Sequence, residues 1–118
     1  MFRSLIRRID DVVVVDLGGR ITLGEANLQL RQLLHELIGK GERAVLLNLA
    51  EVTYIDSSGL GELVVGFTSM RSAGGELKLL NLTRKVHDLL QITKLYTVFD
   101  VQDDEATAIA RFTKPAKA

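Results

Sequence analysis

The stretch Thr53-Tyr-Ile-Asp-Ser-Ser-Gly-Leu-Gly-Glu-Leu-Val64 decides the fold, because the period of the apolar residues changes within it. Before it, residues 44–49 are apolar apart from Asn48, which is typical of a buried strand. From this stretch onward, apolar residues recur at helical spacing, at Leu60, Leu63, Val64, Phe67 and Met70. The sequence therefore predicts a strand, a turn and a helix, with the turn at Asp56, Ser57, Ser58 and Gly59.

The polar side chains of this turn have two interpretations. In an open α/β sheet, ligands and partners bind at the carboxyl ends of the strands, and a helix that starts there offers free N–H groups. Asp56, Ser57 and Ser58 are three candidates for one or two capping positions. We therefore expect at least one of them to face solvent, where a hydroxyl is open to modification. The alternative is that they serve only as caps, since polar clusters at turns are common.

Two strands are predicted at the beginning of the chain. Residues 5–9 and 12–17 have strand character, and a tight turn at residues 10–11 joins them as a hairpin. The four valines at 12–15 predict a strand that is covered on both faces. We expect Gly18–Gly19 to end this second strand.

A helix is predicted over residues 23–38. Thr22 and Glu25 have the spacing of a capping box, which makes Thr22 the predicted cap. Gly39 or Gly41 is the predicted end of the helix. Its apolar stripe comprises Ala26, Leu30, Leu33, Leu34, Leu37 and Ile38.

The last third of the chain predicts a strand over residues 76–80, a helix over 83–92 and an edge strand over 96–101. A final helix follows, capped by Asp103 or Asp104. This order of elements predicts an α/β fold with one mixed, mostly parallel sheet of about five strands and about four helices.

Composition limits the possible functions. The chain has 118 residues, 47% of them hydrophobic, which predicts one domain over residues 1–112 and a disordered tail over 113–118. It has no cysteine, and its 15 basic and 15 acidic residues give no net charge that would attract nucleic acid. We find no signal peptide and no apolar run that could span a bilayer. We therefore expect a soluble, cytoplasmic protein that binds no nucleic acid and does not insert into a membrane.

The turn lacks the residues of a catalytic site. A serine hydrolase needs Gly-x-Ser-x-Gly and an activating base, whereas Ser57 lies between Asp56 and Ser58. The two histidines, His35 and His87, are predicted to lie on the surfaces of other helices. Phosphate-binding loops, dinucleotide fingerprints and the spacing of metal ligands are also missing. We expect a protein that is not an enzyme and has no cofactor or metal.

The outer face of the predicted helix after the turn is a candidate partner surface. Gly61 and Val65 lie one helical turn apart on this face. A small residue allows close approach, and the valine adds apolar area. A single exposed valine is also common on surfaces that bind nothing.

The turn and the strand before it resemble the signature of the STAS domain, a family of bacterial anti-sigma-factor antagonists and sulfate-transporter tails. The resemblance covers about residues 9–110 and is carried by the strand 45–49, Val52, Tyr54, Ile55 and the run Asp56-Ser-Ser-Gly-Leu-Gly61. It implies the α/β fold predicted above.

In the regulatory members of this family, the first serine after the aspartate is phosphorylated, and by position that residue is Ser57. The resemblance implies that the unphosphorylated chain binds an anti-sigma factor, a serine/threonine kinase of histidine-kinase-like ATPase fold, and releases the sigma factor. Phosphorylation of Ser57 would switch the antagonist off, and a metal-dependent serine/threonine phosphatase would reset it. The implied partner-binding residues are Thr22, Asp56, Ser57, Ser58, Gly59, Gly61 and Val65.

The chain departs from the family pattern at one position. Regulatory members often have an aspartate three residues after a glycine that follows the second strand, whereas Gly19 is followed at this spacing by Thr22. Any contact that depends on the aspartate is therefore in question. The alternative function is a constitutive STAS binding module, either a scaffold subunit of a signalling assembly or a component of a lipid-transport complex.

Overall fold

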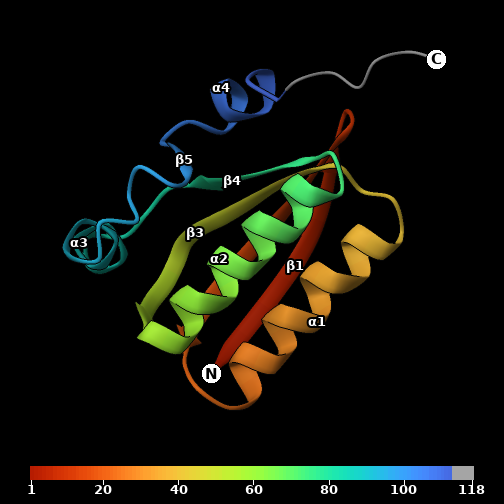
Figure 1. The fold of residues 1–118 in the computed structure, drawn as a ribbon. Coiled ribbons are helices and arrows are strands. Elements are labelled where there is room, and N and C mark those ends of the chain that lie inside the picture. Colours follow the sequence, from red (N-terminus) through yellow and green to blue (C-terminus); the bar gives the residue numbers. More distant parts are fainter. Residues whose placement is uncertain (113–118) are drawn as a thin grey trace.

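A computed structural model describes residues 1–112, which form a five-stranded sheet and four helices (Figure 1). The predicted tail at 113–118 lies outside the described residues. The elements are β1 (Phe2–Ile9), β2 (Val12–Ile21), α1 (Glu25–Gly39), β3 (Ala44–Ile55), α2 (Ser57–Ser72), β4 (Glu76–Leu80), α3 (Arg84–Ile92), β5 (Asp100–Gln102) and α4 (Glu105–Ala110). The predicted fold class is confirmed.

The sheet has the strand order β1-β2-β3-β4-β5. β1 pairs with β2 in antiparallel fashion, and the other three pairs are parallel. The crossovers through α1, α2 and α3 all step in the same direction across the sheet. Because such crossovers are right-handed, these three helices share one face of the sheet, and α4 packs on the other.

The four valines of β2 show how both faces of the sheet are used. Val13 and Val15 lie in the larger core beneath α1, α2 and α3. Val12 and Val14 lie in a smaller core with Leu46, Leu80, Ala108 and Phe112, beneath α4. The predicted coverage of both faces is therefore confirmed, since successive side chains of a strand point to opposite faces.

The prediction that Gly18 and Gly19 end the second strand is wrong, because β2 continues through them to Ile21. The Arg3 guanidinium lies over Gly18, and Gly19 has a φ of 87° where the Met1 carbonyl approaches. The register with β3 shifts on either side of this pair. The glycines therefore bend the strand and allow close approach, as at a β-bulge.

Two further predictions need correction. Thr22 does not cap α1: the N-cap is Gly24, which has a φ of 111°, and no side chain of residues 1–112 caps the helix. The last strand begins at Asp100 and not at 96, because residues 95–98 form turns that close α3. In these turns, Leu95 and Tyr96 donate their backbone N–H groups to the Leu90 carbonyl.

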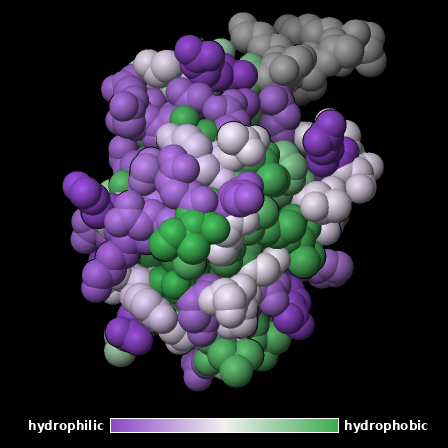
Figure 2. Space-filling model, turned by 60° about the vertical axis from the view of Figure 1, so that its left-hand side comes forward, coloured by the Kyte–Doolittle hydropathy of each residue, from purple (hydrophilic) through white to green (hydrophobic). Residues whose placement is uncertain are grey.

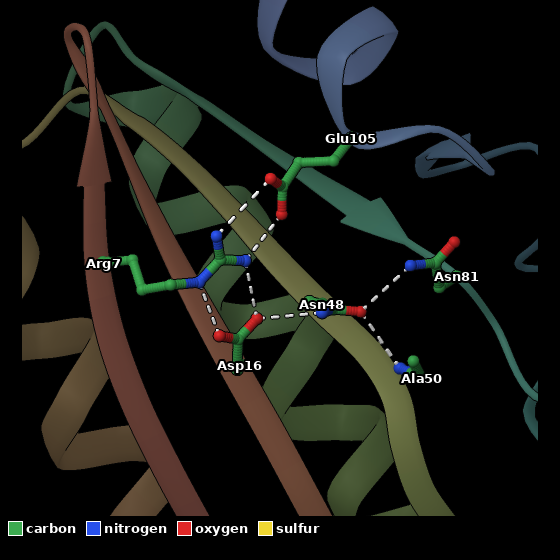
Figure 3. A network of polar contacts seen from close by, with 6 residues as sticks. All are labelled: Arg7, Asp16, Asn48, Ala50, Asn81 and Glu105. Atoms are coloured by element: carbon green, nitrogen blue, oxygen red, sulfur yellow. Dashed lines mark hydrogen bonds and ion pairs between the residues drawn. The ribbon is translucent and has the colours of Figure 1, made fainter.

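A polar network fastens α4 to the sheet (Figure 3). The Arg7 guanidinium of β1 donates to both Asp16 oxygens, at 2.6 and 3.0 Å, and to Glu105 of α4, at 2.5 Å. Asn48 donates to Asp16 at 2.8 Å and accepts from Asn81 at 3.3 Å. The network therefore joins three neighbouring strands, the end of β4 and the helix. No helix in residues 1–112 is long and apolar enough to cross a membrane.

Candidate functional site: the turn between β3 and α2

Asp56 is the residue that caps α2. It has extended backbone angles, and its Oδ1 accepts from the Gly59 N–H at 2.8 Å and from the Ser58 hydroxyl at 2.6 Å. Of the three candidate caps in the sequence, the structure therefore assigns this position to the aspartate. Its carboxylate also lies at the positive end of the helix dipole.

The same carboxylate holds the neighbouring loop. Asp56 Oδ2 accepts from the Leu23 N–H at 3.0 Å, and the Asp56 N–H donates to the Ile21 carbonyl at 3.2 Å. The Ser58 hydroxyl bond lowers the pKa of Asp56, the Gly59 and Leu23 backbone bonds lower it further, and burial opposes them. The carboxylate is therefore ionised at neutral pH, and it joins the ends of β2 and β3.

Ser58 is held by bonds on both sides. It accepts a hydrogen bond from Asn27 Nδ2 of α1 at 2.7 Å, and it donates its own proton to Asp56. Ser58 is half-buried, and Asn27 is only 6% exposed. This serine is therefore part of the connection between α1 and α2.

Ser57 differs from its neighbour. It is the first residue of α2, it is exposed, and its hydroxyl has no hydrogen-bond partner among residues 1–112. The prediction that at least one polar side chain of the turn faces solvent therefore agrees with the structure. A group added to the Ser57 oxygen would break no bond of the cap.

The two glycines of the motif have different surroundings. Gly59 is buried, and a Cβ there would lie 2.8 Å from Ile21 Cγ2 and 2.9 Å from Ile55 Cγ1. Gly61 is exposed, and apart from its own helical backbone no atom of residues 1–112 lies within 4 Å of where its Cβ would be. Gly59 thus lets the helix start close to the ends of the strands, whereas Gly61 leaves open surface.

The outer face of α2 is exposed at Gly61 and at Val65, whose side chain is 57% exposed. On the side of the molecule shown in Figure 2, apolar side chains form patches that are separated by polar ones. Glu62, next to Gly61 in the sequence, is buried and forms an ion pair with Arg31 of α1 at 2.5 Å. The pairing with α1 therefore narrows the open face of α2.

Thr22 lies on the loop between β2 and α1, which is bound to the β3–α2 turn through the hydrogen bond from Leu23 to Asp56. It lines a shallow hollow together with Arg20 and Gln29. The two histidines lie on other helices: His35 is exposed on α1, and His87 packs on the Tyr96 ring at 4.9 Å.

Sequence reasoning missed two residues of this site. Leu23 is 80% exposed beside the turn, and no local pattern predicted its bond to Asp56. Asn27 carried a signal, because it is a polar residue next to the apolar stripe of α1, and it is buried.

The chain is similar to known proteins in sequence and in fold. The sequence model of the STAS domain matches residues 4–108. The anti-sigma-B factor antagonist of Bacillus subtilis is 32% identical over 96 residues, covering 81% of this chain and 86% of that protein.

Two solved structures have the same fold. The crystal structure of TM1081 from Thermotoga maritima has a TM-score of 0.83 and 28% identity, covering 91% of this chain and 92% of that chain. The phosphorylated form of the Bacillus protein SpoIIAA has a TM-score of 0.73 and 22% identity, covering 92% and 98%. The matched sequence model, the relatives and the sheet order together show that this chain belongs to the STAS domain family.

Proposed function

We propose that this chain is an anti-sigma factor antagonist that phosphorylation of Ser57 switches off. The relative from Bacillus subtilis is named for antagonism of an anti-sigma factor, and SpoIIAA has been described in phosphorylated form. The observation that carries the proposal is the free, exposed hydroxyl of Ser57 at the start of α2. Its neighbours hold the turn together, so the Ser57 hydroxyl can be phosphorylated without breaking the contacts of the turn.

The unmodified turn and the outer face of α2 form the proposed binding surface. Gly61 allows the partner to approach the helix closely, and Val65 supplies apolar area. Leu23 extends this area on the neighbouring loop, where its backbone is tied to Asp56. Thr22, Asp56, Ser58 and Gly59 contribute by shaping the same end of the sheet.

Phosphorylation would act at the interface and not on the fold. It adds about −1.5 to −2 charges at neutral pH. The start of α2 stabilises an exposed phosphate by about 0.3 to 1 kcal/mol, and the ionised Asp56 opposes it by repulsion. These opposed effects are similar in size, so the free protein should keep its structure. At the interface, burial of a phosphate without a basic partner costs several kcal/mol, which is enough to dissociate a micromolar complex.

The proposed partners follow from this cycle. The anti-sigma factor is also the serine/threonine kinase, and it has a histidine-kinase-like ATPase fold. When the antagonist binds to it, it releases the sigma factor. A metal-dependent serine/threonine phosphatase restores the Ser57 hydroxyl. The chain itself then acts as a binding protein and as the substrate of both enzymes, without catalysis of its own.

The first experiment isolates the protein from its native cells under phosphatase inhibition, measures its intact mass and maps any phosphate by peptide fragmentation. The co-purifying partner then serves for calorimetry with three variants. Ser57→Asp should abolish binding and leave the melting curve close to wild type, whereas Ser57→Ala should bind but resist phosphorylation.

Ser72→Asp is the matched control, because it adds the same charge to an exposed serine about 22 Å further along α2. It should bind like the wild type. Unchanged binding of Ser57→Asp would refute the switch. An unmodified protein in a stable complex under all growth conditions would favour a constitutive STAS module. Collapse of the Ser57→Asp fold would make Ser57 a structural residue.

A further inference from the structure

Asn27 is a buried polar residue whose hydrogen-bonding capacity is only partly used. It lies on the face of α1 that also buries Leu30, Leu34 and Leu37. Its Nδ2 donates to Ser58 at 2.7 Å, while its Oδ1 is buried without a partner among residues 1–112. An unsatisfied buried polar atom reduces stability. The side chain is therefore not explained by stability alone.

The orientation of the Asn27 amide follows from the chemistry of Asp56. The ionised carboxylate can only accept, so the Ser58 proton must point to Asp56 across the 2.6 Å contact. Ser58 then has no proton to offer to Asn27, and the amide nitrogen must be the atom that donates to Ser58. The three side chains thus form a chain of two hydrogen bonds, in which Asn27 donates to Ser58 and Ser58 donates to Asp56.

This chain of hydrogen bonds distinguishes the hydroxyl of Ser58 from that of Ser57. To be phosphorylated, a serine oxygen forms a bond to the γ-phosphorus of a nucleoside triphosphate held by the kinase. The bond between that phosphorus and the β–γ bridging oxygen breaks, the nucleoside diphosphate leaves, and the hydroxyl proton passes to a base of the kinase. Ser58 has one lone pair engaged by Asn27, and its proton is held by Asp56. Ser57 has neither restriction.

We propose that Asn27 restricts phosphorylation to Ser57 by holding the Ser58 hydroxyl inside the helix cap. This inference rests on the proposed function and adds to it the determinant of site selectivity. Asn27 acts through Ser58 and is a positioning residue. Without the amide, the Ser58 hydroxyl keeps only its bond to Asp56, so it leaves the cap for the solvent beside Ser57 more often.

The test compares phosphate positions in tagged copies of the full chain, expressed in the native cells and isolated under phosphatase inhibition. In the wild type, we expect at least tenfold more phosphate on Ser57 than on Ser58. In Asn27→Leu, this ratio should fall at least fivefold. Adding Ser58→Ala to Asn27→Leu should remove the second site. Asn27→Ala serves as a second variant if leucine does not fit the space.

Leu30→Met is the matched control, because it changes the same buried face of α1 one turn away and leaves the Ser58 bonds in place. It should keep the wild-type ratio. A folded Asn27 variant that still carries phosphate on Ser57 alone would overturn the inference while the switch stands. A wild-type protein that never carries phosphate on Ser57 would instead overturn the proposed function and, with it, this inference.

Discussion

Replacing Gly59 by alanine tests whether α2 must start in contact with the ends of β2 and β3. The added Cβ would lie 2.8 Å from Ile21 Cγ2 and 2.9 Å from Ile55 Cγ1, and closer still to the Ile21 carbonyl oxygen. The carbonyl cannot rotate away, because it accepts the Asp56 N–H at 3.2 Å. The start of the helix must therefore shift outward.

The size of the effect follows from three contributions. Overpacking of a close contact costs about 1 to 3 kcal/mol. Weakening the bond from Asp56 to Ile21 adds about 0.5 to 1.5 kcal/mol, and the better helix propensity of alanine returns about 1 kcal/mol. We expect Gly59→Ala to lower the free energy of unfolding by about 0.5 to 3.5 kcal/mol.

Gly61→Ala is the matched control, because it is in the same helix and, in the described part of the chain, only its own helical backbone lies within 4 Å of its Cβ position. It should raise the free energy of unfolding by about 0.5 to 1 kcal/mol. Urea unfolding followed by circular dichroism at 222 nm measures both changes. The reasoning would be refuted if Gly59→Ala were as stable as Gly61→Ala.

Three further predictions concern the α4 network, the cap and the partner surface. Arg7→Met should lower the free energy of unfolding by about 1 to 2 kcal/mol, and Glu105→Gln should cost less in that background than in the wild type. Additive effects in urea unfolding would show that the two side chains are not coupled. Asp56→Ala should lower the free energy of unfolding by about 1 to 2 kcal/mol at pH 7 and by less in acid. Because the folded pKa of Asp56 is depressed, its contribution is complete above the unfolded pKa of about 3.9 and is lost as pH falls through the folded pKa. A cost that persists in acid would contradict an ionic cap. Val65→Ser should change the free energy of unfolding by at most about 0.5 kcal/mol and weaken partner binding in calorimetry. Undiminished affinity would remove Val65 from the interface.

The predictions from sequence succeeded where the local signal and the tertiary structure agree. The period change around residues 56–59 predicted the β3–α2 unit, and the valines at 12–15 predicted a strand covered on both faces. The predicted end of the second strand at Gly18–Gly19 was wrong, because glycine occurs at a β-bulge as readily as at the end of a strand. Which of the two occurs depends on β1, whose pairing with β2 continues from the predicted hairpin as far as Phe2 and Gly19, beyond the ends of the two predicted strands.

The prediction that Thr22 caps α1 was wrong for a related reason. Thr22 and Glu25 have the spacing of a capping box, but the Leu23 backbone beside them is bound by Asp56, 33 residues away. That contact fixes the path of the loop, so the helix starts after Gly24 without a side-chain cap. The burial of Glu62 also depends on a distant partner, because Arg31 comes from a different helix. Local periodicity predicts which face of a helix is apolar, but it does not predict polar pairs between helices.

The arrangement of the turn separates residues with structural roles from Ser57, for which a regulatory role is proposed. Asp56 caps the helix and holds the neighbouring loop, Ser58 joins the cap to α1, and Gly59 lets the helix start close to the strands. Each of these residues is bonded or packed, so changing any of them should lower the stability of the protein. Ser57 lies among them without such a role, and a change there should alter binding without altering stability. The proposed switch needs this combination, because a phosphate on Ser57 must change the surface that a partner contacts while the protein itself stays folded.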